Sequence, residues 1–444
     1  MRTLLLFLLS VAACQSHDSI ENLVAARCGA CHAEGAGVRF DPASTPALSR
    51  LIAQRVAADE MPPWLPSAEG LPLRDSRRLT LDEKTAILDW AAAGAPLSAP
   101  LRRSVESTRP PDAELFPDGF YTPRAVADDG RCFLLPPLPR SAWVVGYAWR
   151  PGHPEALHHV AAGVVRAAEL PRYLAAEAVD AEPGWDCITS PGVDASPFSA
   201  SAVRGGSRFD EGSGVYLGPG DRLVLDVHYV PRGLREPDRT GVALWLAEGP
   251  LREVRGTVVG APVELPCPTR QGVRCDRKEA AAADPWPSAL SYADAMLAAC
   301  GDSVVEVERR NPAASAVPST YLVETRCTTA APSATVDRIH LHAHTRLRSA
   351  RLELLRGSEA RTILHVPSWD WRWEETFALS SPLLVVAGDH FRVSATFDNG
   401  DLAQWSDVGE PGHGGPAPAP RQPPEYRLNT PSKAQEMFHF VVLH

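Results

Sequence analysis

The sequence is poor in several features, and each absence narrows the possible functions. Lysine occurs only at Lys84, Lys278 and Lys433, and 44 basic residues face 54 acidic ones, which gives a net charge of −10 at pH 7. No run of basic residues stands out. Nucleic-acid-binding proteins usually have such clusters to contact phosphates, so we expect no nucleic-acid partner. No internal repeat stands out either, which argues against a repeat array.

A long apolar run is also missing. The N-terminal run Leu4–Leu9, behind one positive charge, is too short to span a bilayer and predicts a secretory signal. It ends at Cys14 in Val-Ala-Ala-Cys, which resembles a bacterial lipobox and implies a lipoprotein signal over 1–14 with a lipidated Cys14. An ordinary signal peptide cut near Ala13 is the alternative. Either signal exports the protein, and Gln15 favours a periplasm-facing lipoprotein anchored in the outer membrane.

The motif Cys28-Gly-Ala-Cys31-His32 follows the signal. Two thiols at this spacing can each bond covalently to a haem vinyl group, while the adjacent His32 binds the iron. The rival interpretations are a redox dithiol and a structural zinc site. Zinc needs further ligands nearby, and the next cysteine is Cys132. The sequence therefore favours a covalently bound haem c.

Methionine is rare, with only four residues in the chain, and Met61 lies in the segment Glu-Met-Pro-Pro-Trp after the haem motif. It is the candidate for the sixth iron ligand, and packing in a loop is its alternative role. Iron held by His and Met has a raised reduction potential, which suits electron transfer. A capped helix is expected over Thr80–Gly94. Residues 19–98 resemble the short cytochrome c domains fused to exported bacterial oxidoreductases.

After a Pro-containing linker over 99–119, short apolar or alternating segments are separated by Gly and Pro turns. This pattern predicts a mainly β fold, with two tandem jelly-roll-like β-sandwiches over 120–248 and 250–444 behind the small all-α cytochrome domain. The expected strands are 141–149, 222–230, 240–246, 336–348, 351–355 and 383–397.

Three histidine motifs lie in these β regions. In the pair His342-Ala-His344, both imidazoles project from the same face of a strand and can bind one copper, zinc or iron ion. The consecutive His158 and His159 point to opposite faces unless a bulge or a strand end turns them together. The third motif is the single His228. Each motif alone is more often surface or packing chemistry than a ligand set.

Taken together with Met437, these motifs follow an order that resembles the copper type II, ascorbate-dependent monooxygenases. That family includes peptidylglycine α-hydroxylating monooxygenase and dopamine β-monooxygenase, and the resemblance spans about residues 120–444. It implies an electron-transfer copper and a catalytic, oxygen-activating copper. The first would be held by His158, His159 and His228, and the second by His342, His344 and Met437. Imidazole serves both copper states, and a thioether favours Cu(I).

Three positions depart from the family. His340 stands where the peptide-amidating members have an arginine that anchors the substrate carboxylate. His439 and Val441 replace polar and tyrosine anchors after the methionine, so a peptidylglycine substrate is not implied. His340 shares a strand face with His342, where it either supports the ligands or is a solvated neighbour.

The cysteines outside the lipobox and the haem motif number six, and an even number in an exported protein favours disulfides. They are Cys132, Cys187, Cys267, Cys275, Cys300 and Cys327. Four of them fall in the second sandwich, so Cys132–Cys187 is the expected pair in the first. The other four allow three pairings, and the sequence does not choose among them.

The expected function is therefore an exported monooxygenase that hydroxylates a C–H bond of a small organic substrate with O2, using two coppers and one haem c. Electrons would come from an ascorbate-like reductant or from a redox protein through the haem. Membrane contact would be limited to the lipid anchor. The alternatives are a non-catalytic haem/copper electron-transfer or copper-binding lipoprotein, and a structural or sensor protein with a degenerate copper fold.

Overall fold

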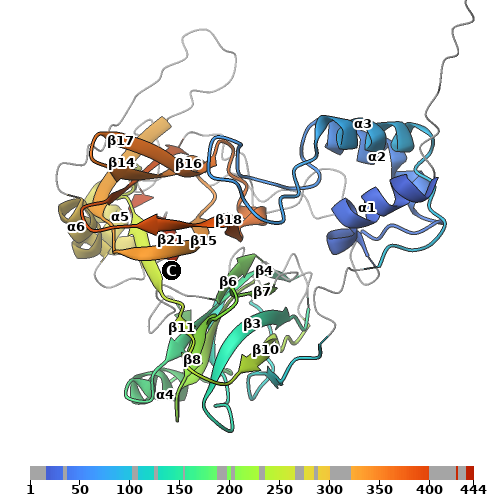
Figure 1. Ribbon diagram of the computed structural model, residues 1–444. Coiled ribbons are helices and arrows are strands. Elements are labelled where there is room, and N and C mark those ends of the chain that lie inside the picture. The colour runs from blue at the N-terminus through green and yellow to red at the C-terminus, as the bar shows by residue number, and fades with distance from the viewer. Residues whose placement is uncertain are drawn as a thin grey trace, which may run out of the picture. The chain divides into compact units, whose positions relative to one another are not determined.

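The computed structural model describes residues 17–33, 38–102, 109–124, 129–153, 156–187, 198–201, 206–229, 236–265, 275–284, 289–300, 322–399, 427–428 and 437–444. The chain divides into two compact units. Unit 1 comprises Met1–Trp64 and Ser76–Thr108, and unit 2 comprises Leu65–Asp75 and Arg109–His444. The chain is mainly β (Figure 1). No described helix has both the length and the apolar character needed to cross a membrane.

Unit 1 is built on three described helices, α1 (His17–His32), α2 (Thr45–Ala57) and α3 (Leu81–Ala92). The predicted helix over Thr80–Gly94 is confirmed. The Thr80 hydroxyl accepts a hydrogen bond from the Glu83 N–H, and the Glu83 carboxylate accepts one from the Thr80 N–H. Gly94 follows the helix with φ of 94°, a conformation that suits glycine. The buried core joins all three helices through Val24, Ile52, Val56, Ile87 and Trp90.

The first sandwich of unit 2, formed by β1 to β11, has two sheets. One has the order β1-β10-β3-β8-β11 with β7 beside β3, and the other has the order β5-β2-β9-β4-β6. Buried side chains of both sheets form one apolar core. The strands are β1 (Ala113–Leu115), β2 (Asp129–Leu134), β3 (Ala142–Arg150), β4 (Leu157–Val165), β5 (Trp185–Asp186), β6 (Phe198–Ser201), β7 (Gly206–Arg208), β8 (Ser213–Leu217), β9 (Arg222–Tyr229), β10 (Gly241–Ala247) and β11 (Arg252–Glu253), and helix α4 (Leu170–Ala178) lies between β4 and β5 in the chain.

The second sandwich, formed by β12 to β21, pairs the sheet β12-β21-β15-β18 with the sheet β14-β19-β16-β17, and β13 pairs with β20. Phe397 of one main sheet contacts Phe438 of the other edge-on. The elements are β12 (Gly256–Gly260), β13 (Glu264–Leu265), α5 (Arg277–Ala283), α6 (Ala289–Ala299), β14 (Leu322–Ala330), β15 (Ala334–Ala343), β16 (Leu347–Arg356), β17 (Glu359–Val366), η2 (Trp371–Trp373), β18 (Thr376–Val385), β19 (His390–Asp398), β20 (Arg427–Leu428) and β21 (Phe438–Leu443).

Two of the expected strands are wrong in extent. The expected strand 336–348 is two strands, β15 and β16, because the chain turns at residues 344–346. The expected strand 383–397 likewise divides into β18 and β19 around a turn that contains Gly388, whose φ is 89°. The first turn consists of the polar residues His-Thr-Arg at 344–346 and the second contains Gly388, so both interrupt the apolar alternation on which the expected strands depend.

The segment Leu65–Asp75 belongs to unit 2 although unit 1 flanks it on both sides. Its backbone runs along two strands of the second sandwich (Figure 1). The Leu71 N–H donates to the Ile363 carbonyl at 2.9 Å, and the Arg74 N–H donates to the Ala378 carbonyl at 2.8 Å. The segment therefore extends the hydrogen bonding of β17 and β18.

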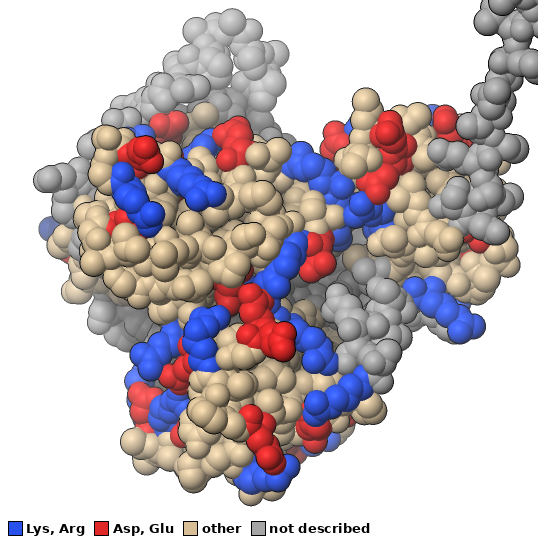
Figure 2. Space-filling view, in the orientation of Figure 1, with Lys and Arg blue, Asp and Glu red and all other residues tan. Residues whose placement is uncertain are grey.

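The two sandwiches meet within unit 2. Val441 and Leu443 of β21 are members of the first sandwich's apolar core. Arg338 of β15 pairs with Asp210 of the first sandwich at 3.2 Å, and Arg74 pairs with the same carboxylate at 2.7 Å. Figure 2 shows acidic and basic side chains mixed over unit 2. Apolar and ionic contacts therefore hold β15 and β21 against the first sandwich.

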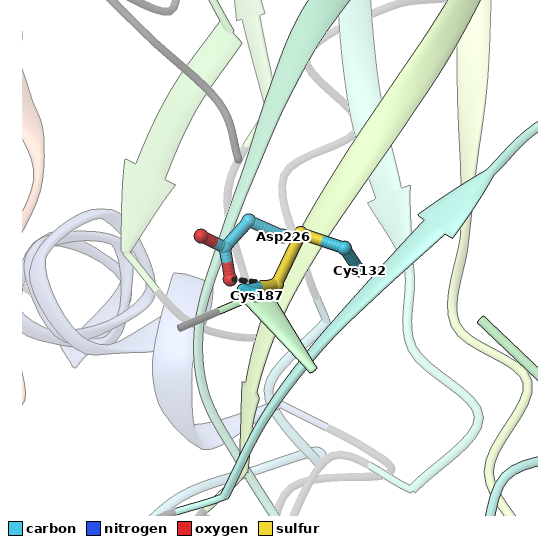
Figure 3. A group of neighbouring side chains, drawn as sticks. All are labelled: Cys132, Cys187 and Asp226. Atoms are coloured by element: carbon cyan, nitrogen blue, oxygen red, sulfur yellow. Dashed lines mark hydrogen bonds between the residues drawn. A yellow bond between two sulfur atoms is a disulfide. The ribbon is translucent and has the colours of Figure 1, made fainter. Parts of the chain in front are cut away.

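Two disulfides are fully described. Cys132–Cys187 joins β2 to the residue after β5, as expected, and Cys300–Cys327 is one of the pairings that the sequence left open. Asp226 lies beside the first disulfide, with its Oδ1 atom 3.3 Å from the Cys187 sulfur (Figure 3). Sulfurs joined in a disulfide are not thiolate ligands, so this group is no metal site while oxidised. Cys275 is also disulfide-bonded, and Cys267 lies outside the described residues.

Candidate metal centre

The histidines of the first sandwich lie on the neighbouring strands β4 and β9. The register between these strands shifts at His158: Leu157 pairs with Tyr229, and His159 pairs with His228. This is the bulge that the consecutive histidines require, because the extra residue lets the strand redirect one side chain. The side chain of His158 lies outside the described residues.

His159 and His228 are close enough to share a metal ion. Their Nδ1 atoms lie 3.3 Å apart, and the rings meet edge-on with centroids 4.6 Å apart. Two nitrogens about 2.0 Å from one tetrahedral metal lie roughly 3.3 Å from each other. The same spacing suits a weak hydrogen bond when one ring is protonated at Nδ1. The spacing is therefore compatible with two ligands of one ion, which stays a prediction.

The candidate ligand histidines of the second sandwich are His342 on β15, His344 directly after β15 and His439 on β21. His342 pairs directly with His439 across these strands, and their ring centroids are 5.1 Å apart. The His344 ring lies 5.5 Å from that of His342. Met437 immediately precedes β21 and is half-buried. Since the last pair is Ala343 with Phe438, continuing the register by one residue puts Met437 level with His344.

His439 is a possible donor that the predicted ligand set omits. Burial lowers its pKa well below the usual range, and the neighbouring His342 and His340 lower it further. A neutral imidazole keeps the lone pair that a metal ligand needs. The sequence signal was available, because His439 is two residues after Met437 on a strand and so shares its face.

Glu374, which the sequence analysis missed, is buried beside these histidines and follows the short helix η2. Its Oε1 atom accepts hydrogen bonds from His340 Nε2 at 3.1 Å and from His342 Nδ1 at 3.0 Å. The Nδ1 atom of His340 lies 3.3 Å from the Thr376 hydroxyl. Both ring nitrogens of His340 are therefore engaged, so His340 supports Glu374 and is not placed as a metal ligand.

Glu374 is ionised in this environment. Burial by itself raises its pKa, but the nearby His342 and His159, with the hydrogen bonds from His340 and His342, bring the pKa well below its usual value. Because Oε1 accepts from Nδ1 of His342, that ring presents Nε2 on its opposite side. A carboxylate that fixes the tautomer of a histidine in this way is common at metal sites.

The two histidine sets converge at the junction of the sandwiches. The rings of His159 and His342 meet edge-on with centroids 5.7 Å apart. One candidate ligand atom from each of His159, His342 and Glu374 lies within 4.8 Å of the others. Figure 1 shows the end of the first sandwich that carries β4 and β6 facing β15 and β21. The donor chemistry, imidazole with carboxylate, fits a borderline divalent metal ion.

Unit 1 holds the residues of the predicted haem site. His32 ends α1, and its Nδ1 atom lies 2.7 Å from the Val38 carbonyl, a contact that orients the imidazole. The ring stacks on Phe40 with centroids 4.3 Å apart. Cys28 and Cys31 lie on the same helix and are not in a disulfide, and Cys28 and Met61 pack against one apolar core. The residues present fit a haem c.

The Cys28 thiol is not a reactive nucleophile by itself. Burial, followed by the adjacent Cys31, raises its pKa to about 12, so the thiol stays protonated at neutral pH. Cys14, the predicted lipidation site, lies outside the described residues. The two disulfides are compatible with an exported protein.

Comparisons with known proteins add no functional assignment. No protein-family model matches the chain, and no curated protein matches it. A solved structure of allantoicase shares 10% identity over 62% of this chain and 77% of its own, with a TM-score of 0.16. Oxalate decarboxylase of Bacillus subtilis shares 9% identity over 67% and 80%, with a TM-score of 0.11. Procruciferin of Brassica napus shares 11% identity over 65% and 84%, with a TM-score of 0.10. Such low scores support no argument about the fold or the function.

Proposed function

We propose that the chain is an exported copper-dependent monooxygenase with a fused cytochrome c domain and two tandem jelly-roll-like copper domains. The observation that carries the proposal is the convergence of His159 and His228 with His342, His344 and His439 at one junction. Each histidine set comes from paired strands of a rigid sandwich, so the donors are positioned before any metal binds.

The proposed reaction is the hydroxylation of a C–H bond. R–H, O2, two electrons and two protons give R–OH and water. Copper, when bound, supplies one-electron chemistry with O2, which the side chains themselves cannot perform. The chain's contribution is positional: the His159–His228 pair and the His342–His344 pair present nitrogens, Glu374 fixes the ring of His342, and Met437 would offer a thioether at the end of β21.

The cytochrome is proposed as the source of these electrons. Bound haem would carry one electron at a time from a reductant or a redox protein to the copper donors. His32 and Met61 would ligate the iron, and Cys28 and Cys31 would attach the haem covalently. The support is the motif at the end of α1, with His32 oriented by the Val38 carbonyl.

The place of action follows from the N-terminus. We infer a periplasm-facing lipoprotein held in the outer membrane through Cys14, with a small organic substrate and O2 as partners. The support is the lipobox-like sequence together with the described disulfides, which form in oxidising compartments.

One observation favours the second candidate, a non-catalytic haem/copper electron-transfer or copper-binding lipoprotein. His439 adds a further imidazole opposite His342, and four protein donors would close a site that catalysis needs open. In that case copper would bind tightly but O2 would not be consumed.

Substitution of Met437 separates these candidates. Protein matured with copper in a periplasm is analysed for copper, haem and O2 consumption, as wild type and as Met437→Ala. If the chain is a monooxygenase, the wild type should contain two coppers and one haem per chain. Met437→Ala should then keep its haem spectrum but lose O2 consumption. Haem without copper, or copper binding and O2 consumption that are indifferent to Met437, would support the carrier instead. Met296→Ala, a second internal methionine, is the matched control.

A further inference from the structure

Glu374 lies against both histidine sets, and only one of its two oxygens is accounted for. Oε1 accepts hydrogen bonds from His340 and His342, whereas the buried Oε2 has no hydrogen-bond partner among the described residues. An unsatisfied buried polar atom destabilises the fold, and more so when the group is charged. Native sites usually remove this cost with a bound ion or an ordered water molecule.

We propose that His159, His342 and Glu374 form one metal centre that spans the two sandwiches, with Glu374 as its carboxylate ligand. The donor atoms come from β4, from β15 and from the loop after η2, and they lie within 4.8 Å of one another. The proposal rests on the proposed function for the choice of copper, because two imidazoles and a carboxylate also suit zinc and iron(II).

The charge of the site supports a cation there. Glu374 has an exposed fraction of only 2%, so its carboxylate is almost wholly removed from water. A buried carboxylate needs a positive charge close by. A divalent ion held by Glu374, His159 and His342 supplies that charge.

The alternative is that Glu374 only orients His342 within a site confined to the second sandwich. In that arrangement His342 Nδ1 keeps its hydrogen bond to Oε1, and His159 has no share in the ion. In the spanning centre the ion would take the place of the proton between His342 Nδ1 and Glu374, whose atoms lie 3.0 Å apart. The two arrangements differ in whether the first sandwich is needed. A spanning centre loses its ion when either sandwich loses its ligand, whereas a confined site does not depend on His159.

The test is metal titration of the metal-stripped full chain with Cu(II) alone and, separately, with Zn(II) alone. Affinity is measured by chelator competition, together with the rise in Tm on metal addition. The variants are Glu374→Gln, His159→Ala and the double variant. The matched control is Glu69→Gln, because Glu69 also contacts a histidine of unit 2, His365, but is exposed. Equal Tm values without metal show that each variant is folded.

A spanning centre predicts that each single variant weakens the tightest-bound ion by more than about tenfold, while Glu69→Gln does not. It also predicts that the double variant binds this ion more weakly than either single variant, because both residues hold the same ion. Wild-type affinity in Glu374→Gln overturns the proposal. Wild-type affinity in His159→Ala also overturns it, because the site would then be confined to the second sandwich.

The design separates this centre from the proposed function. If the chain binds zinc through Glu374 and His159 but takes up no copper, the spanning centre is supported and the proposed monooxygenase function is contradicted. If copper binding depends on Met437 but not on Glu374, the spanning centre is contradicted and the proposed monooxygenase function is supported.

Discussion

The charge of Asp389 is tied to one partner, Arg356. Asp389 lies in the turn between β18 and β19, where both of its carboxylate oxygens contact the Arg356 guanidinium, at 2.9 and 2.6 Å. One of these oxygens also accepts a hydrogen bond from the Val386 N–H. Arg356, followed by this backbone hydrogen bond, lowers the pKa of Asp389 from 3.8 to about 2. The ion pair thus closes the turn only while Asp389 is ionised.

This shift predicts how stability depends on pH. A carboxyl group with a lower pKa in the folded chain than in the unfolded chain stabilises the fold. This stabilisation is complete when the pH is above the pKa of the unfolded chain, and it is lost as the pH falls through the pKa of the folded chain. We expect Asp389→Asn to be less stable than wild type at pH 6, and the difference to shrink as pH falls from about 4 to about 2. Urea denaturation across this range measures it.

The control for this prediction is Glu211→Gln, which changes an exposed carboxylate in a turn of the first sandwich. Its stability difference from wild type should stay near zero over the same range. A difference for Asp389→Asn that does not change between pH 6 and pH 2 would show that the ion pair does not stabilise the turn.

At the same scale, Glu374 shows why part of the site could not be predicted. The residue lies 32 positions from His342 and 34 from His340, in a Trp-rich segment with no metal motif. Its role comes from the way β15 and the loop after η2 pack together, which no local pattern reports. The paired spacing of His342 and His344, in contrast, follows directly from the period of a strand.

At the scale of elements, α3 shows what local chemistry can specify. Thr80 and Glu83 form a reciprocal capping box at its N-terminus, and the Glu83 carboxylate also contacts Arg27 of α1 at 2.7 Å. The sequence predicts this helix because the cap, the apolar spacing and Gly94 are all local signals. The turn at residues 344–346 contains neither glycine nor proline, and the turn at 386–389 is marked only by Gly388 and Asp389 within an otherwise strand-like stretch.

Removing the cap should loosen α3. Thr80→Ala leaves the Glu83 N–H without its side-chain acceptor, which lowers the stability of the helix by about 1 kcal/mol. Where local opening of the helix controls amide exchange, the exchange rate should rise roughly fivefold. Hydrogen-exchange mass spectrometry of the α3 peptide measures the effect. Thr85→Ala, on the exposed face of the same helix, is the matched control and should not speed exchange. Equal protection in both variants would contradict the capping role.

At the scale of the whole molecule, the chain passes between its two units three times. It leaves unit 1 after Trp64, returns at Ser76 and leaves again after Thr108. Because one chain would hold both the haem of unit 1 and the metal of unit 2, we expect electron transfer within the molecule, at a rate that does not depend on protein concentration. The sequence analysis did not foresee that Leu65–Asp75 pairs with strands nearly 300 residues later.

The most direct test of the account follows haem reoxidation by O2. Protein loaded with haem and copper is fully reduced without air, mixed with O2 in a stopped-flow instrument and followed through the haem absorption bands. The account predicts fast reoxidation in copper-loaded wild type, and much slower reoxidation in copper-free protein and in His342→Ala. Equal rates with and without copper would show that the histidine junction does not conduct electrons from the haem to O2, and would contradict the account.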